Sequence, residues 1–113
     1  ALQMYEESMA IKERIGDELG KANTAGMLAQ LLAYEQNDYE RGLQLMNYAV
    51  AIYEHLKSVE LEKAEEIRSQ MFIDQIQYEL GEEVLQAFMK VYEAEGPEKA
   101  LQWLEEKRKQ KGE

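Results

Sequence analysis

The stretch Gly42-Leu43-Gln44-Leu45 decides the fold, because the chain repeats it. Its counterparts are Ala1-Leu2-Gln3-Met4 and Ala100-Leu101-Gln102-Trp103. The first two copies stay in register beyond the repeated phrase, since Ala10-Ile11 falls on Ala51-Ile52 at the shift of 41 residues that separates Ala1 from Gly42. Repeats of this length are typical of stacked helical hairpins. The sequence therefore predicts an all-α repeat array.

Apolar residues at spacings of three and four predict helices along the whole chain, and the strict alternation of a strand is absent. The clearest stripe consists of Leu43, Met46, Ala49, Val50 and Tyr53. Helical spacing also favours core packing for most of the seven tyrosines over an aromatic binding groove. We expect six antiparallel helices, over residues 1–15, 18–35, 39–57, 59–80, 82–95 and 97–109.

Turn residues separate the expected helices. Asp38 and Ser58 are N-cap candidates, because their side-chain oxygens can accept hydrogen bonds from the free amides of a first turn. Gly81 ends one helix, and Gly96-Pro97 is the sharpest boundary in the chain. Glycine tolerates a positive φ after a helix, and proline suits the first helical position.

Composition limits the class of partner. The 113 residues carry a net charge of −10, with 23 acidic and 13 basic side chains. Binding a phosphate backbone needs clustered Lys and Arg, so this balance argues against nucleic acid. The only basic cluster, Lys107-Arg108-Lys109-Gln110-Lys111, either complements the negative end of a helix dipole or forms a docking patch.

The absence of cysteine rules out a disulfide framework and favours a cytoplasmic location. No apolar run approaches the roughly 20 residues of a membrane span. The chain begins at Ala1 inside a helical pattern and without an initiator methionine, which predicts a fragment of a longer array.

The helix openings resemble those of the tetratricopeptide repeat family. In that family a small residue is followed by a large residue four positions later and by another small residue three positions after that. Ala1, Tyr5 and Ser8 match this pattern, and the positions of Gly42, Met46 and Ala49 match it again. Small residues let two helices approach closely, while the large residue fills the space between them. The resemblance implies a right-handed solenoid of helical hairpins.

The period of 41 residues departs from the common repeat of about 34 and resembles a long-helix branch of the family. HEAT-like arrays have a similar period, so a HEAT-like fold or an irregular helical bundle is the alternative. We expect a single domain over residues 1–113. It comprises a trailing helix (1–16), a full repeat (17–57), a divergent repeat (58–95) and a capping helix (96–113).

Catalysis has little support in the sequence. The single histidine, His55, has no partner at the spacing of a metal site. Adjacent acids such as Glu65-Glu66 do not face each other on a helix, so they make poor acid–base pairs. The glycines form no phosphate-binding motif. We therefore expect a protein that is not an enzyme and that has no metal or other cofactor.

The resemblance implies a concave groove, built from the first helix of each hairpin, that mediates protein–protein interaction. Some family members bind a C-terminal carboxylate with a Lys and an Asn four residues apart on the first helix. Here Lys21 is followed at that spacing by Ala25 rather than by Asn, so this kind of site is not expected. The acidic residues favour a basic or mixed peptide segment instead. The candidate groove residues are Thr24, Leu28, Leu31, Glu35, Glu66, Gln70, Ile73 and Gln77.

A second hypothesis gives the chain no ligand of its own. It would be a structural spacer or self-association segment of a larger regulatory protein. The first helix would expose an apolar face without its partner helix, and such a face favours a homodimer.

Overall fold

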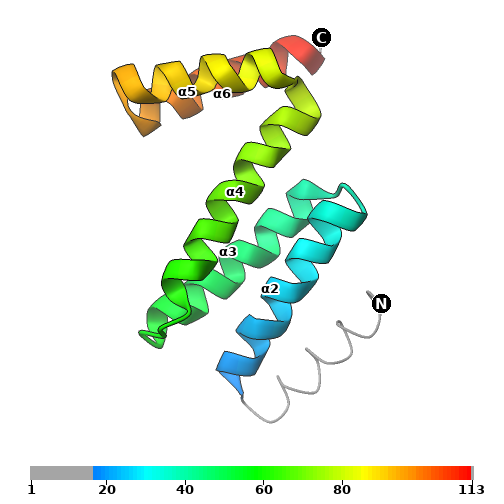
Figure 1. Cartoon of the computed structure of the whole chain (residues 1–113), viewed down its shortest axis with the longest axis vertical. Helices are drawn as coiled ribbons and strands as arrows, with labels where there is room; N and C mark the ends of the chain where they lie inside the picture. Colours follow the sequence, from blue (N-terminus) through cyan, green and yellow to red (C-terminus); the bar gives the residue numbers. More distant parts are fainter. Residues whose placement is uncertain (1–16, 113) are drawn as a thin grey trace. The chain divides into compact units, whose positions relative to one another are not determined.

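The computed structural model describes residues 17–112, which lie in helices and the short connections between them (Figure 1). In chain order the helices are α2 (Glu18–Glu35), α3 (Tyr39–His55), α4 (Leu61–Leu80), α5 (Glu82–Glu95) and α6 (Pro97–Gly112). The all-α class is therefore confirmed. The helix expected over residues 1–15 lies outside the described residues. None of the described helices is long and apolar enough to cross a membrane.

The chain divides into two compact units, Ala1–Phe72 and Ile73–Glu113, with the boundary inside α4. In its described part, the first unit contains α2, α3 and the first half of α4. The second unit contains the end of α4, followed by α5 and α6.

Two aspartates start the helices of the first hairpin. Asp17 Oδ1 accepts a hydrogen bond of 2.7 Å from the Gly20 amide, and Asp38 Oδ1 accepts one of 3.2 Å from the Arg41 amide. Between the helices Asn37 has a φ of 56°, a left-handed conformation that asparagine adopts more readily than most residues. The predicted cap at Asp38 is therefore confirmed, and the chain reverses so that α2 and α3 pack as antiparallel neighbours (Figure 1).

Small residues let α2 and α3 approach closely. A Cβ on Gly42 would lie 2.9 Å from the Ala29 carbonyl oxygen, 3.1 Å from Ala33 Cβ and 3.3 Å from Met71 Sδ. Real Cβ atoms avoid contacts this short, so the observed helix separation needs glycine at position 42. The surrounding core of the first unit consists of Ala22, Ala25, Ala29, Ala33, Tyr39, Met46, Ala49, Val50, Tyr53, Ala64 and Met71.

The turn from α3 into α4 differs slightly from the prediction. Lys57 has a φ of 53°, so α3 ends at His55 rather than at Lys57. Ser58 was expected to cap the next helix, but its Oγ accepts a hydrogen bond of 3.1 Å from the Glu60 amide within the turn. As a result α4 begins at Leu61, two residues later than predicted.

The second unit contains a hairpin of α5 and α6, with one glycine before α5 and another at the turn between the two helices. Gly81 and Gly96 have φ values of 91° and 92°, which favour glycine at both boundaries, as predicted. Leu85 and Phe88 of α5 are buried, as are Ala100 and Leu104 of α6.

A polar network within the second unit joins α6 to the end of α4. Arg108 Nη1 lies 3.1 Å from Glu79 Oε1, and Arg108 Nη2 donates a hydrogen bond of 3.3 Å to Gln75 Oε1. Lys107 Nζ lies 5.5 Å from the centre of the Trp103 ring. Lys109 and Lys111 occupy the last turn of α6, where a cation complements the helix dipole.

The tyrosine prediction is wrong for most of the described tyrosines. Tyr39 and Tyr53 are buried, but Tyr34, Tyr48, Tyr78 and Tyr92 are exposed. Alanines and methionines fill much of the first unit's core in their place.

Candidate functional site

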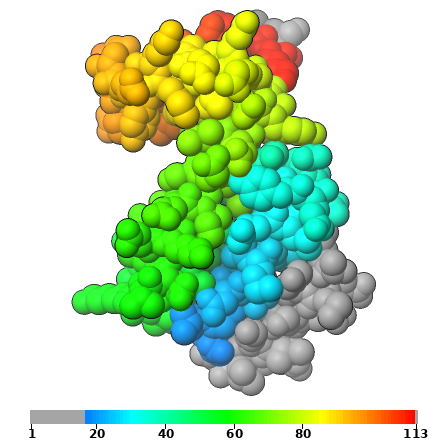
Figure 2. Space-filling model, viewed as in Figure 1, coloured from blue at the N-terminus to red at the C-terminus, as the bar shows by residue number. Residues whose placement is uncertain are grey.

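A hollow of about 260 Å³ opens between α2, α3 and the start of α4 in the first unit. On the face shown in Figure 2, α2 is drawn in blue to cyan, next to the green residues of the α3–α4 region. The hollow is lined by Asn23, Gly26, Met27, Gln30, Met46, Tyr53, Glu60, Lys63, Ala64 and Ile67.

The floor of the hollow is apolar and its rim is polar. Met46, Tyr53 and Ala64 are buried and belong to the core of the first unit. The polar lining residues are exposed, namely Asn23, Gln30, Glu60 and Lys63. Binding surfaces often combine a buried apolar centre with a polar edge in this way.

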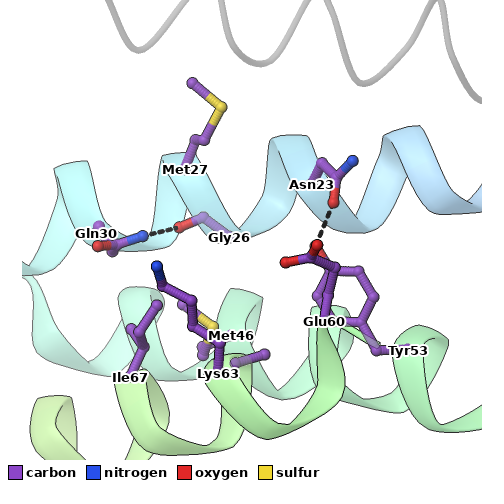
Figure 3. A pocket seen from close by; sticks show the side chains of 10 residues that line it. Asn23, Gly26, Met27, Gln30, Met46, Tyr53, Glu60, Lys63 and Ile67 are labelled. Carbon is purple, nitrogen blue, oxygen red and sulfur yellow. Dashed lines mark hydrogen bonds between the residues drawn. The ribbon is translucent and has the colours of Figure 1, made fainter. Parts of the chain in front are cut away.

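The α2 side of the hollow is a stripe of Asn23, Gly26 and Gln30, which are three and four residues apart and therefore share one helix face. Gln30 Nε2 donates a hydrogen bond of 3.3 Å to the Gly26 carbonyl oxygen (Figure 3). Met27, with 52% of its surface exposed, points away from the α4 side chains in this view. A Cβ on Gly26 would have no heavy atom of the described residues within 4 Å, so this stripe is open at its centre on the side of the hollow.

One end of the hollow is held by a contact between α3 and α2. The Tyr53 hydroxyl donates a hydrogen bond to Asn23 Oδ1 (Figure 3). Burial of the phenol and, second, the nearby Glu60 carboxylate raise the pKa of Tyr53 above the usual value for tyrosine. Because both effects disfavour the phenolate, Tyr53 stays a neutral donor that fixes the Asn23 side chain.

The start of α4 supplies the opposite side. Glu60 lies near the Tyr53 hydroxyl, while the Lys63 amino group points toward α2 near Gly26 and Gln30 (Figure 3). Ile67 packs against the core and closes the apolar surface. The hollow thus has a negative group at the Tyr53 end and a positive group farther along.

The residues predicted to line the groove differ from the residues that line the hollow. Thr24 and Leu28 are buried, Leu31 is half-buried and Glu35 is exposed. None of them lines the hollow, because the α2 residues that do so are one position earlier: Asn23, Met27 and Gln30.

On α4, Glu66 and Gln70 are exposed, but the hollow uses Lys63 and Ile67, which lie one helical turn before them. Ile73 is half-buried and Gln77 is exposed, and both belong to the second unit. The structure therefore does not bring the eight predicted residues together around this hollow.

Among the described residues, the side chains that we weighed for catalysis lie on exposed surfaces, and the acid pair Glu6-Glu7 lies outside the described residues. His55 is exposed at the end of α3, and the acid pairs Glu65-Glu66, Glu82-Glu83 and Glu105-Glu106 are exposed on their helices. Within residues 17–112, no group of three or more histidines and acids is placed to hold a metal ion. The hollow is therefore the site that we consider for function.

Comparison with known proteins adds no relative. No protein-family model, no curated protein and no solved structure matches the chain. Function must therefore be inferred from the hollow itself.

Proposed function

We propose that the chain is a non-catalytic protein-interaction module of the tetratricopeptide type, which takes an extended segment of another protein into the hollow. The observation that carries the proposal is the apolar floor around Met46 with its exposed polar rim. An extended peptide can seat a side chain on such a floor while its backbone amides bind Asn23 and Gln30 at the rim.

The position of the hollow supports the proposed family. If residues 17–57 and 58–95 are consecutive repeats, α2 and α4 are the first helices of their hairpins. The family resemblance implies a binding surface on these first helices. The close approach at Gly42 agrees with the small position that the family pattern requires there. The solenoid architecture is part of this proposal.

Charge favours a partner segment with basic residues. The net charge of the chain is −10. Near the hollow, the turn into α4 and its first two turns carry four exposed glutamates around Lys63, namely Glu60, Glu62, Glu65 and Glu66. A surface of this sign increases the rate of encounter with a cationic segment and disfavours an acidic one.

The proposal can be tested with a library of randomised linear peptides selected on the whole chain. Enriched peptides would be added to isotope-labelled protein, and the amide resonances followed by NMR. We expect shifts concentrated at Asn23, Gly26, Gln30 and Lys63. Enrichment of no peptide, or shifts confined to other surfaces, would contradict the proposed function.

A pair of matched variants locates the binding surface. Gln30→Arg adds bulk and charge at the rim, whereas Gln44→Arg makes the same change at an exposed position of α3 outside the hollow. We expect only Gln30→Arg to weaken binding of the enriched peptides. Equal effects of the two variants would indicate a nonspecific response to charge.

A further inference from the structure

Gly26 has no role in the fold that the described structure reveals. It lies in the interior of α2, where glycine is less favourable than alanine. Its φ is not in the left-handed region, which among the described glycines only Gly81 and Gly96 occupy. Unlike Gly42, it has no neighbour among residues 17–112 that a Cβ would meet. Alanine would therefore fit without strain and would strengthen the helix.

Gly26 does have a place in the hollow. It lies between Asn23 and Gln30 on the lining stripe of α2 (Figure 3). Side chains three and four residues apart share a helix face, so a methyl group at position 26 would project from the same stripe. The absence of a side chain there gives a ligand access to the helix backbone, a common reason for glycine where a ligand approaches closely.

We infer that Gly26 determines specificity, by leaving room for one large apolar side chain of an extended peptide whose neighbouring basic residue pairs with Glu60. This inference rests on the proposed function and identifies the class of its ligand. The anchor side chain would lie over Gly26 and contact Met46, Ala64 and Ile67.

The size of the hollow fits one anchor. Its volume of about 260 Å³ is below the range of roughly 300 to 1,000 Å³ typical of small-molecule sites. Methionines such as Met46 adapt to different shapes and contact aromatic rings favourably, so phenylalanine and leucine are both suitable anchors. In many interfaces a small number of such anchor residues supplies most of the affinity.

The charges orient the peptide. Glu60 lies at the Tyr53 end of the hollow and Lys63 lies farther along α4, so a Lys or Arg of the peptide is favoured at the Glu60 end and repelled near Lys63. The surrounding glutamates of α4 favour the same sign. The ligand class is therefore an apolar anchor with a basic neighbour on one side.

The test uses the peptides enriched from the randomised library and synthetic versions in which the anchor is shortened from Phe or Leu to Val. Binding is measured to the whole chain and to Gly26→Ala. We expect Gly26→Ala to raise the Tm by about 4 °C and to bind the large-anchor peptides about tenfold more weakly. The shortened anchor should lose less affinity for Gly26→Ala than for the natural chain.

Gly112→Ala is the matched control, because Gly112 ends α6 outside the hollow and a Cβ there would meet no described residue within 4 Å. It should leave peptide affinity unchanged. The expected rise in Tm would show that Gly26→Ala is folded, so that weaker binding could not be attributed to unfolding.

The possible failures are distinguishable. If enriched peptides shift the resonances of the hollow but lack an apolar residue with a basic neighbour, or bind Gly26→Ala unchanged, this inference is overturned and the interaction function stands. If no peptide is enriched, both are overturned. If sedimentation shows that the chain self-associates and that Gly26→Ala abolishes this, a second copy occupies the hollow and the inference of a peptide partner is overturned.

Discussion

Two interior glycines, Gly42 on α3 and Gly26 on α2, face opposite surroundings. A Cβ on Gly42 would lie 2.9 Å from the backbone of α2, whereas a Cβ on Gly26 would have no heavy atom within 4 Å in the part of the chain that the structure describes. The first belongs to the packed seam between α2 and α3, and the second to the open hollow. Both glycines weaken their helices locally, but only at the seam does the fold gain close packing in return.

The difference shows that a glycine in a helix has to be interpreted from its neighbours. At the seam, packing contacts explain the residue and its substitution affects stability. At the hollow, no contact within the described structure explains it, and its substitution should affect binding instead. This distinction can be tested with substitutions at the two positions, because those at the seam should change mainly stability and those at the hollow should change mainly binding.

Met46 belongs both to the core of the first unit and to the lining of the hollow, so truncation of its side chain should have the largest effect on stability. Its side chain is 1% exposed in the core and also forms the floor of the hollow. We expect Met46→Ala to lower the free energy of unfolding by about 2 to 5 kcal/mol, because it creates a cavity. Urea denaturation measures this loss. Met27→Ala is the control, since Met27 is 52% exposed, and a comparable loss there would undermine the described burial.

Gly42→Ala tests the seam. The added methyl would force α3 away from the Ala29 carbonyl, and overpacking of this kind typically costs about 1 to 3 kcal/mol. The higher helix propensity of alanine offsets about 1 kcal/mol of this cost. We expect a net loss of up to about 2 kcal/mol by urea denaturation. A more stable variant would show that the helices are not in close contact at Gly42.

Gly26→Ala should change stability in the opposite direction. We expect a gain of about 1 kcal/mol in the free energy of unfolding, because alanine favours the helix and meets no neighbour among the described residues. The same urea measurement applies, with Gly42→Ala as the matched substitution. If both variants are destabilised, the contrast between the seam and the hollow disappears.

Tyr53→Phe tests the support at the end of the hollow. Loss of the hydrogen bond to Asn23 should cost about 0.5 to 1 kcal/mol of stability. Tyr48→Phe removes a hydroxyl from an exposed tyrosine of the same helix and should change stability little. Thermal denaturation measures the stability of both variants. Equal losses of stability would falsify the stabilising role of the hydrogen bond between Tyr53 and Asn23.

The raised pKa of Tyr53 predicts a small effect at alkaline pH. Because the pKa is higher in the folded chain than in the unfolded chain, the stabilisation is complete below about pH 10 and declines as the pH rises through the folded value. We expect the stability difference between the natural chain and Tyr53→Phe to shrink above pH 10. A difference independent of pH would indicate an unperturbed phenol.

The helices were largely predictable, because their boundaries depend on local chemistry. The predicted bounds of α2 and α5 are confirmed, and the predicted cap at Asp38 and the breaks at Gly81 and Gly96 are observed. The errors lie at helix ends: α6 continues to Gly112, three residues beyond its predicted end, and the others lie at the turn between α3 and α4. Lys57 adopts a left-handed conformation that its residue type does not favour, so α3 ends two residues before the predicted end.

The site was less predictable, because α2 is apolar on more than one face. Leucines and alanines occupy several faces of this helix, so the sequence does not reveal which stripe remains open to solvent. We predicted Thr24 and Leu28 as groove residues, and both are buried. Polar Asn23 and Gln30 on either side of Gly26 were the available signal. On α4 the predicted groove residues lie one turn after the residues that line the hollow, because helical periodicity does not show which half of a helix borders α2.

The unexplained glycine also has an evolutionary consequence. Selection for folding alone should replace Gly26 with alanine, since that substitution is expected to stabilise the helix and meets no steric barrier from residues 17–112. Gly42 should persist in every lineage that keeps the fold. Descendants that retain the proposed ligand should therefore keep both glycines, while descendants that have lost it should drift at position 26 alone.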